Sequence, residues 1–555
     1  MGKVIALGLA LALAACGESE RSGGPATASA PVDISVETLK TVTQRLSSDE
    51  FEGREPGTPG EAKTLAYLVE QFQAAGLKPG NNGSWFQDVP LVELEAKNVS
   101  PLTFTGGAQP LSFAYGPQMV VGTNRVTPRI DVRNSDVVFV GYGINAPERG
   151  WNDYAGVDVK GKTVVILIND PDWETQGLQG PFGGRAMTYY GRWTYKYEEA
   201  AKQGAAAALI VHQTEPAAYG WNVVQSSWSG PQQVADAANG HMDQTLANGW
   251  IGLDQAKALF ASGGQDFGRL AAAAKTKGFR AVPLGGLKAS VGFDVAVRKH
   301  ASKNVVGILP GTTRADEYVL YTAHWDHLGR CDKAPDGDDI CNGAIDNATG
   351  TAALVALAAA NAKAGPTPRT QVYLAVTAEE SGLLGSAYYG ANPIFPHAQT
   401  VGGVNIDAMQ LAPPARNVVV VGKGKSELDG FLERALASQG RVATAEPTPE
   451  KGFYYRSDHF SFAKQGVPML YFDGRDDLVQ GGKAAGKAYA DDYEKNRYHG
   501  PADEFDPAWD MAGAAQEGQV AYELGKELAN SRRWPTWNDG VEYKPIRQAT
   551  DAARR

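Results

Sequence analysis

The stretch QVYLAVTAEESGLLGS, residues 371 to 386, places two glutamates directly behind a run of apolar residues. The run from Val372 to Val376 is typical of a strand that is buried on both faces of a sheet. Glu379 and Glu380 follow it side by side, and adjacent carboxylates at the end of a buried strand repel each other and lose their hydration. The stretch therefore predicts a buried strand and raises the question of what offsets the two negative charges.

Short apolar runs of the same kind recur through the second half of the chain. Strands are predicted at residues 304 to 309, 318 to 323, 371 to 377, 401 to 406, 417 to 421 and 467 to 472. Residues 349 to 363 predict a helix that ends before Gly365 and Pro366. Apolar strands that alternate with helices indicate an α/β fold with a doubly wound, mostly parallel central sheet covered by helices on both faces.

The first half of the chain begins with helices and continues with a β-rich segment. Helices are predicted from about residue 36 to 46 and from about 60 to 77. From about residue 133, short apolar runs bounded by Gly and Asn predict strands, and residues 195 to 212 predict a helix followed by a strand. The alternation typical of the doubly wound sheet resumes after about residue 287. We therefore interpret residues 133 to 287 as a self-contained, mainly β insert.

The composition excludes two broad classes of protein. Of the 555 residues, 43% are hydrophobic and 21% are charged, as in a globular protein, so disorder of the whole chain is excluded. The formal net charge is −10, and no basic block is present that could neutralise phosphates. We therefore expect no nucleic-acid partner and no polyanionic substrate.

The N-terminus has the pattern of an export signal. Residues 1 to 16, MGKVIALGLALALAAC, carry one lysine and an apolar run that is too short to span a bilayer. The ending LAAC resembles a lipobox, in which Cys16 is acylated, and Gly17 fits sorting to the outer membrane. This predicts an outer-membrane lipoprotein that faces the periplasm, with residues 17 to 32 as a flexible tether. An ordinary signal peptide, giving a soluble periplasmic or secreted protein, is the alternative.

Two further cysteines bound an acidic loop, CDKAPDGDDIC, from Cys331 to Cys341. In an oxidising compartment this spacing is compatible with a disulfide, and two free buried thiols are the alternative.

Residues that can bind metal stand at the predicted carboxyl ends of the strands or on loops. They are His324, Asp326 and His327 after one strand, Glu379 and Glu380 after another, Asp407 after a third, and Asp346 and His499 on loops. Any one of them alone is more often a hydrogen-bonded polar residue at a strand end. Imidazoles and carboxylates gathered at one edge of a sheet, however, are the ligands that zinc prefers. A bound dication would also offset the charge of one glutamate and leave its neighbour free as a general base.

Six motifs in a fixed order resemble those of the di-zinc exopeptidases, peptidase family M28, which includes secreted bacterial aminopeptidases, glutamate carboxypeptidase and the non-catalytic transferrin receptor. The motifs are AHWDHLG (323 to 329), NGAIDNATG (342 to 350), TAEESGLLGS (377 to 386), VNIDAM (404 to 409), FYYRSDHFSF (453 to 462) and YHGPADEF (498 to 505). The segment DEFEGREPGTPG near the N-terminus also looks familial. The insert is similar to a protease-associated domain.

The resemblance implies two Zn²⁺ per chain and a role for each matching residue. One zinc would be bound by His324, Asp346 and Asp407, and the other by Asp346, Glu380 and His499, with Asp346 as the bridge. Glu379 would be the general base, Tyr498 would assist the substrate carbonyl, and Asp326 would orient His324. The family also places a cis peptide between Asp346 and Asn347. The chain departs from compact members in the 22-residue separation of His324 from Asp346, which accommodates the cysteine-bounded loop.

The domain organisation follows from the same reading. We expect a signal peptide at 1 to 16, a tether at 17 to 32, a split zinc peptidase domain at 33 to 132 and 288 to 535, the protease-associated insert at 133 to 287, and a C-terminal tail at 536 to 555.

The expected function is an aminopeptidase that acts on peptides, with membrane contact through the lipid anchor alone. A carboxypeptidase or dipeptidase with the same metal core is the alternative, because Arg456 could clamp a terminal carboxylate. A non-catalytic peptide- or protein-binding homologue is the alternative from another class. Tyr454, Tyr455, Arg456 and His459 are candidates for a substrate pocket, and local hydrogen bonding is the other interpretation of His459.

Overall fold

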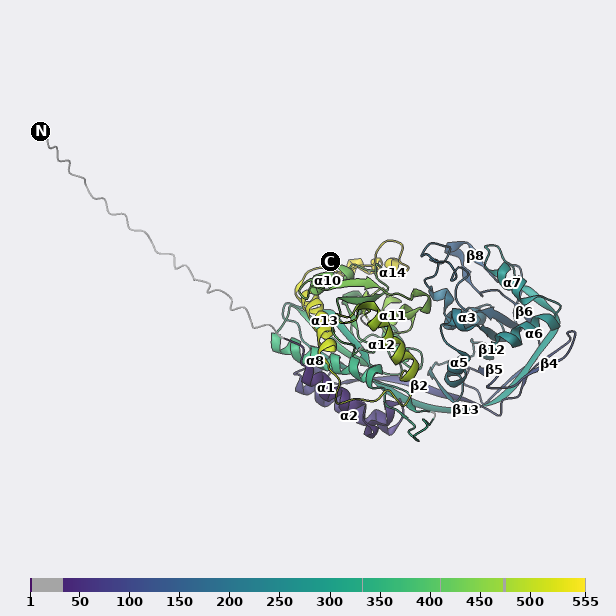
Figure 1. Cartoon of the computed structure of the whole chain (residues 1–555), viewed down its shortest axis with the longest axis horizontal. Coiled ribbons are helices and arrows are strands. Elements are labelled where there is room, and N and C mark those ends of the chain that lie inside the picture. Colours follow the sequence, from purple (N-terminus) through teal and green to yellow (C-terminus); the bar gives the residue numbers. More distant parts are fainter. Residues whose placement is uncertain (2–32, 332, 410, 473–475, 555) are drawn as a thin grey trace. The chain divides into compact units, whose positions relative to one another are not determined.

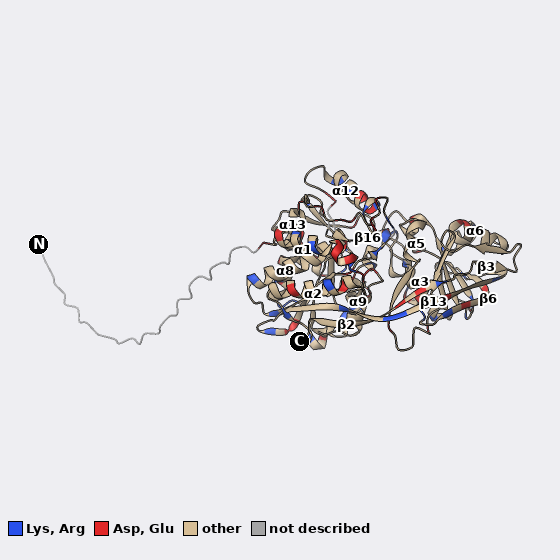
Figure 2. Cartoon of the chain, turned by 90° about the horizontal axis from the view of Figure 1, so that it is seen from below, with Lys and Arg blue, Asp and Glu red and all other residues tan. Residues whose placement is uncertain are grey.

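A computed structural model describes Met1 and residues 33 to 331, 333 to 409, 411 to 472 and 476 to 554 (Figure 1). The predicted signal sequence, Cys16 and the tether lie outside the described residues. Among the residues that are described, no helix combines the length and the hydrophobicity needed to cross a membrane. Lys and Arg are interspersed with Asp and Glu over the helices and strands (Figure 2).

The central sheet contains every strand that was predicted in the second half of the chain. In spatial order its strands are β13 (Val282–Leu309), β17 (Arg369–Val376), β14 (Arg314–His324), β18 (Thr400–Asn405), β21 (Met469–Phe472), β19 (Asn417–Val421) and β20 (Val442–Ala445). The pairs from β17 through β14 and β18 to β21 are parallel, whereas β13 and β19 join this block in antiparallel orientation. The sheet is therefore mostly parallel, as the sequence predicted.

Helices cover both faces of this sheet, which confirms the predicted fold class. The helices α1 (Val36–Leu46), α8 (Gly350–Ala364) and α13 (Ala512–Asn530) pack together on one face (Figure 1). On the other face, Tyr389 of α9 (Leu384–Ala391) and Phe462 of α11 (His459–Ala463) share a core with Leu320 of β14. The neighbouring Tyr321 points to α13 instead, where it lies against Gly525. This alternation is the two-residue period of a strand that is covered on both faces.

The ends of the predicted helices follow local signals. Helix α1 begins after Ser35, whose side chain accepts a hydrogen bond from the amide of Thr38 at 3.1 Å. Helix α2 (Pro59–Ala74) ends three residues before the predicted limit. The reason is Gly76, whose φ of +88° is left-handed and stops the helix.

Two long strands carry the chain from the central sheet into a second β region. Strand β2 (Phe86–Lys97) pairs with β13 along residues 294 to 305. The other strands of this region are β3 (Leu102–Thr105), β4 (Leu111–Phe113), β5 (Met119–Gly122), β6 (Arg129–Phe139), β7 (Asn145–Ala146), β8 (Trp151–Asn152), β9 (Thr163–Leu167), β10 (Ala207–His212), β11 (Pro231–Ala235) and β12 (Ala247–Gly252). Its helices are α3 (Trp193–Lys202), α4 (Thr214–Ala217), α5 (Trp221–Ser227), α6 (Leu253–Ser262) and α7 (Phe267–Ala274). Helix α3 and strand β10 are the predicted helix and strand between residues 195 and 212.

The core of this β region extends beyond the predicted insert. Besides residues between 133 and 287, it contains residues on both sides of the predicted insert. Val92 and Leu94 of β2 precede the insert in sequence, and Val295 of β13 follows it. The reason is that β2 and β13 are long enough to contribute to both cores. The sequence pattern marked only the point at which short strands become frequent.

The C-terminal segment packs against the central sheet. Trp537 and Arg547 are 1% and 2% exposed, and Arg547 lies in the short helix α14 (Lys544–Gln548). Its guanidinium donates hydrogen bonds to the carbonyl oxygens of Thr400 and Val401 at the start of β18. Residues 536 to 555, predicted as a tail, thus include a structural part of the fold.

Candidate metal centre

The candidate site lies where three parallel strands end side by side. In the sheet register, His324 at the end of β14 is opposite Val376 at the end of β17, and Thr322 is opposite Asn405 at the end of β18. Parallel neighbours have their carboxyl ends at one edge. The residues at and after these strand ends are consequently brought together from positions up to 83 residues apart in sequence.

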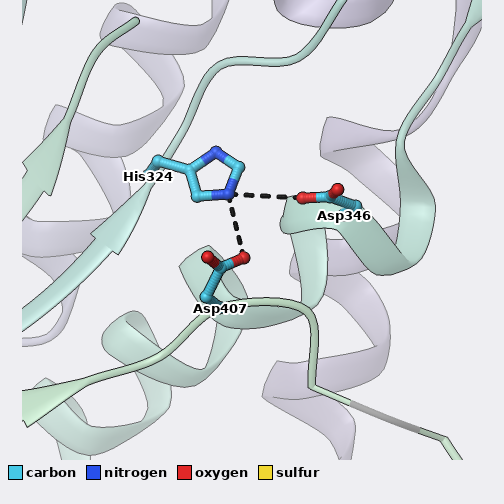
Figure 3. A group of neighbouring side chains, drawn as sticks. All are labelled: His324, Asp346 and Asp407. Atoms are coloured by element: carbon cyan, nitrogen blue, oxygen red, sulfur yellow. Dashed lines mark hydrogen bonds and ion pairs between the residues drawn. The ribbon is translucent and has the colours of Figure 1, made fainter. Parts of the chain in front are cut away.

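The first group of candidate ligands surrounds the imidazole of His324. Its Nε2 lies 3.1 Å from Oδ1 of Asp407 and 3.3 Å from Oδ1 of Asp346 (Figure 3). The two carboxylates approach the same nitrogen from different loops. All three side chains are at most 13% exposed.

The second group uses the other oxygen of Asp346. His499 Nε2 lies 3.3 Å from Asp346 Oδ2 and 3.1 Å from Glu380 Oε2. A further imidazole, that of His327, lies 2.6 Å from Glu380 Oε1 through its Nδ1. His327, Asp346 and Glu380 form a set whose ligand atoms all lie within 4.8 Å of one another, as do those of His324, Asp346 and Asp407. Asp346 is therefore common to both groups.

Two carboxylates of the centre, Asp346 and Glu380, stay ionised although they are buried. Burial by itself would raise the pKa of Glu380. The positive charge of His499 is the largest opposing cause, and the pKa of Glu380 is lowered to about 2. Asp346 likewise has a pKa well below its usual value, because His324 and His499 outweigh the effect of burial. The same carboxylates raise the pKa of His499 to about 10 against burial. The site therefore favours positive charge, which protons on the histidines or bound cations can supply.

The donor set fits zinc. Each group combines imidazole nitrogen with carboxylate oxygen, and this combination binds zinc in proteins. The closeness of several negative oxygens in a buried place would be unfavourable without a cation, and Asp346 offers one oxygen to each group.

Glu379 and Glu380 have different environments, although they are adjacent in sequence. Glu380 faces His327 and His499, as described above. Burial raises the pKa of Glu379 well above its ordinary value; the charge of His324 opposes this shift, and those of Asp407 and Glu380 add to it. Glu379 is thus a carboxylate with a high proton affinity beside the two groups, which suits a general base.

The predicted role of Asp326 needs a correction. Its carboxylate is 3.8 Å from Nδ1 of His324, and Nδ1 lies 3.2 Å from the main-chain carbonyl oxygen of Asp326 instead. The carboxylate accepts hydrogen bonds from the amides of Glu379 and Glu380 at 3.2 and 3.4 Å. The expectation came from the family resemblance; in this structure β14 ends at His324, so residues 324 and 326 do not lie on one face of a strand. The carboxylate of Asp326 therefore holds the main chain at Glu379 and Glu380, and its main-chain carbonyl contacts the imidazole of His324.

The loop that carries Asp346 is held by side chains on either side of it. Asp503, in the YHGPADEF motif, accepts hydrogen bonds from the amides of Ile345 and Asp346 at 3.0 and 3.1 Å. Asn347 accepts from the amide of Ala408 at 3.0 Å and donates to the carbonyl of Ile406 at 3.2 Å. The peptide bond between Asp346 and Asn347 is cis, as the resemblance implied. These contacts tie the Asp346 loop to the loop of Asp407.

The most important residue that the sequence reasoning missed is Arg54. It is fully buried and donates hydrogen bonds to four carbonyl oxygens, those of Leu46, Trp325, Asn342 and Gly343, at 2.6 to 2.9 Å. Burial lowers its pKa to about 10, while Asp326, Asp503, Asp346 and Glu380 raise it. Arg54 thus links the segment after His324 to the segment before Asp346. Its position in the familial stretch DEFEGREPGTPG was the only available signal.

The disulfide between Cys331 and Cys341 is present and closes the loop between these two segments. Strands β15 (Gly329–Arg330) and β16 (Ile340–Cys341) form a small hairpin at its base. Gly53 packs against this hairpin: a Cβ atom on it would lie 2.5 Å from the carbonyl oxygen of Gly329, and its φ is +66°. Only glycine fits this turn without strain.

The remaining predicted residues divide into exposed and buried ones. Tyr498 is 47% exposed, and its ring stacks on that of His499 with centroids 3.8 Å apart. Tyr454, Tyr455 and His459 are at most 7% exposed and pack in an aromatic core with Tyr543 and Phe460. Burial lowers the pKa of His459 to about 3. Of the four candidates for a substrate pocket, Arg456 alone keeps partial exposure.

Ser457, which follows Arg456, was also missed by the sequence reasoning. Its hydroxyl donates a hydrogen bond of 2.5 Å to Oδ2 of Asp407. The RSDH part of the FYYRSDHFSF motif therefore contacts the first ligand group directly.

Comparison with known proteins places this site in a family. Residues 304 to 522, which contain all of the candidate ligands and Glu379, match the profile of peptidase family M28. No curated protein sequence matches the chain.

Solved structures resemble the chain over most of its length. An aminopeptidase from Aneurinibacillus sp. strain AM-1 is 20% identical, with a TM-score of 0.52, and the match covers 90% of this chain and 95% of that one. BSAP, a zinc aminopeptidase from Bacillus subtilis, is 16% identical, with coverage of 93% and 98% and a TM-score of 0.46. A peptidase M28 precursor from Shewanella amazonensis SB2B is 15% identical, with coverage of 90% and 96% and a TM-score of 0.41. At these identities the first of the three establishes a shared fold.

Proposed function

Because residues 304 to 522 belong to peptidase family M28, we propose that the chain is a zinc-dependent exopeptidase that removes residues from the free N-terminus of peptides. The observation that carries this proposal is the pair of ligand groups that share Asp346. A carboxylate with one oxygen toward each group is the arrangement that a two-metal hydrolytic centre requires.

We assign His324, Asp346 and Asp407 to one zinc and Asp346, Glu380 and His499 to the other. His327 contacts Oε1 of Glu380, whereas His499 contacts Oε2. His327 therefore either orients this carboxylate or adds a ligand to the second zinc. Two bound zinc ions would supply Lewis acidity toward a water molecule and the peptide carbonyl.

Glu379 is the proposed general base. Its raised pKa makes it a good proton acceptor, and it can pass the proton on to the leaving amine. Asp326 fixes the main chain of Glu379 through its amide, and this keeps the carboxylate from swinging away from the ligand groups. Tyr498 is exposed beside His499, and we assign it the role of donating a hydrogen bond to the carbonyl oxygen of the substrate.

A carboxypeptidase or dipeptidase remains the second candidate function. The observation that favours it is the partly exposed guanidinium of Arg456, which has no carboxylate partner among the described residues. A non-catalytic binding protein is disfavoured, because the five candidate ligands are close together and Glu379 directly precedes one of them. We also propose that the protein is anchored to the outer membrane through Cys16 and faces the periplasm.

The test is mass spectrometry of unblocked and N-acetylated peptides after incubation with the zinc-loaded protein, with and without a chelator. We expect residues to be lost from free N-termini only, and we expect the chelator to abolish this loss. Cleavage of acetylated peptides from their C-termini would establish the carboxypeptidase instead. If the zinc-loaded protein cleaves no peptide, the peptidase proposal fails and the binding-protein alternative replaces it.

A further inference from the structure

Both glutamates of the centre lie on one closed turn, residues 377 to 385, which follows strand β17 and is called the glutamate turn below. The amide of Gly385 donates to the carbonyl oxygen of Thr377 at 3.0 Å, so the two ends of the turn meet. A Cβ atom on Gly385 would lie 2.2 Å from that oxygen, and only glycine permits so close an approach. The direction of Glu379 therefore depends on how the two ends are held.

Two residues of the glutamate turn have backbone angles that normally favour glycine. The φ angle of Ala378 is +52°, and that of Leu383 is +65°. Left-handed angles are unfavourable for residues with a Cβ atom, and they persist only where the surroundings impose them. Ala378 stands directly between Thr377 and Glu379, so a relaxation of its φ would rotate the glutamate. The turn therefore needs contacts that hold it from outside.

Asn304 of strand β13 contacts both ends of the glutamate turn through one side-chain amide. The residue is 0% exposed. Its Oδ1 accepts a hydrogen bond from the amide of Thr377 at 3.0 Å, and its Nδ2 donates to the carbonyl oxygen of Gly385 at 3.0 Å. A side-chain amide has the same donor and acceptor groups as a peptide unit. Asn304 therefore extends the hydrogen bonding of the sheet beyond Val376, where β17 ends.

Asp326 holds a different part of the same turn. Its carboxylate accepts hydrogen bonds from the amides of Glu379 and Glu380 at 3.2 and 3.4 Å. Asn304 fixes the ends of the turn, whereas Asp326 fixes the main chain of the two glutamates themselves. With both sets of contacts in place, the strained Ala378 has no freedom to relax.

The paired strands β2 and β13 support Asn304 from behind. Gln87 lies opposite Asn304 in this pairing, and its Oε1 accepts a hydrogen bond from Asn304 Nδ2 at 3.0 Å. Gln87 in turn donates to the carbonyl oxygen of Asn392 at 2.7 Å. Ser302, two residues before Asn304 and on the same face of β13, shares a hydrogen bond of 2.6 Å with the hydroxyl of Thr377. The two strands that continue into the β region thus hold the glutamate turn.

We propose that Asn304 is a positioning residue for the general base: its side-chain amide fixes the glutamate turn and thereby the direction of the Glu379 carboxylate. This inference rests on the proposed peptidase function, in which Glu379 accepts a proton. The contacts of Asn304 are with main-chain atoms of the turn and with Gln87, so it acts through Glu379 and not on the substrate. From the sequence, residue 304 was predicted only as the first residue of a strand.

The test is a double-mutant cycle between residues 304 and 379. Asn304→Leu keeps a similar size and removes all three hydrogen bonds of the side chain. In protein saturated with zinc it should lower kcat by about 10- to 100-fold and change KM by less than about twofold, because a small misplacement of a reacting group slows the chemical step. In the Glu379→Gln background the same substitution should cause no further loss of kcat. Losses that multiply would overturn the proposal, because Asn304 would then act by a route other than Glu379.

A second variant and a matched control guard against simple loss of the fold. Gln87→Leu leaves Asn304 in place but removes its support, so kcat should fall by about three- to tenfold, and only while Glu379 is present. Asn361→Leu is the control, since Asn361 is 2% exposed and donates to the carbonyl oxygen of Leu357 within α8. It should lower the temperature of unfolding and leave kcat unchanged. Folded variants at residues 304 and 87 that both keep the wild-type kcat would also overturn the proposal.

Hydrogen exchange separates this inference from the peptidase proposal. Amide exchange in residues 377 to 385 should become at least about tenfold faster in Asn304→Leu and stay unchanged in Asn361→Leu. If exchange in Asn304→Leu equals that of the wild type, Asn304 does not hold the turn, and the inference fails while the peptidase function stands. If the wild type cleaves no peptide, the peptidase function and the role of Glu379 fail, and exchange alone decides whether Asn304 holds the turn.

Discussion

Asp346 shows how single residues build this site. One oxygen of its carboxylate faces His324 and the other faces His499, each at 3.3 Å, and its amide is held by Asp503. The surrounding residues supply rigidity rather than chemistry, because Asn347 and Arg54 use their side chains to fix main-chain atoms. Ligands that are held in this way lose little entropy when a cation binds.

The first prediction concerns Glu379. The substitution Glu379→Gln preserves shape but removes the basic oxygen, so kcat should fall by about 100- to 10,000-fold. The zinc content should stay at two per chain, because Glu379 is assigned no ligand role. Turnover on a peptide substrate and elemental analysis of the purified protein measure the two quantities. Glu433→Gln, at a side chain that is 61% exposed, serves as the control. Normal turnover of the Glu379 variant would contradict the assignment.

The second prediction concerns Arg54. Arg54→Met removes the donors to four buried carbonyl oxygens, so the free energy of unfolding should fall by at least about 3 kcal/mol. The affinity for zinc should also fall by about 10- to 100-fold, because the loops of His324 and Asp346 lose their link. Denaturant titration and competition with a chelator measure these effects. Arg45→Met, at a 47% exposed side chain, is the matched control. An unchanged zinc affinity would show that Arg54 only stabilises the fold.

At the scale of elements, the site depends on three strand ends and one closed loop. Strands β14, β17 and β18 deliver His324, the two glutamates and Asp407 to one edge, because parallel neighbours end together. Asp346 does not follow a strand and reaches the edge through the loop between β14 and α8. The disulfide shortens the free part of that loop.

The third prediction tests this loop. Closing a loop of about ten residues by a disulfide stabilises a protein by about 2–3 kcal/mol in the chain-entropy description. The double variant Cys331→Ala, Cys341→Ala should therefore have a free energy of unfolding that is lower by about this amount. Denaturant titration of the variant and the wild type measures the difference. Its zinc affinity should fall less than that of Arg54→Met, because the carbonyl contacts of Arg54 remain. A double variant as stable as the wild type would show that packing of the hairpin alone holds the loop.

At the scale of the whole molecule, two cores share the strands β2 and β13, so the β region and the central sheet are continuous through paired backbone. Binding of zinc at the edge of the central sheet should therefore stabilise the chain against unfolding. Asp346 and Glu380 are the reason, since their carboxylates are buried close to other ligand groups and ionised.

The fourth prediction follows from this coupling. Zinc at 100 times its dissociation constant should raise the free energy of unfolding by about 2.7 kcal/mol per site, and a chelator should reverse the effect. Asp346→Asn should lose this zinc-dependent increase, because one side chain serves both groups. Thermal unfolding with added zinc, with chelator and with magnesium as a control measures it. An equal response of wild type and variant would remove Asp346 from the metal site.

Local pattern in the sequence was sufficient for the main elements of the fold. The buried run before Glu379, the helix after Asp346 and the strands of the central sheet were all predicted within a few residues, because apolar runs and Gly or Pro breaks act over short distances. The motif residues His324, Asp346, Glu380, Asp407 and His499 were also named in advance, and the structure brings them together.

Tertiary structure decided what depends on distant contacts. Arg54 and Asp503 act through main-chain atoms of other segments, which no local pattern reveals. The extent of the β region depended on the length over which β2 and β13 are paired. The burial of Arg547 depended on the main-chain carbonyl of Thr400, which accepts its hydrogen bond. Local sequence pattern and motif spacing therefore determined the secondary-structure elements and the candidate ligand residues of this protein. Packing between segments far apart in sequence determined their partners, because hydrogen bonds and charges depend on distance in space.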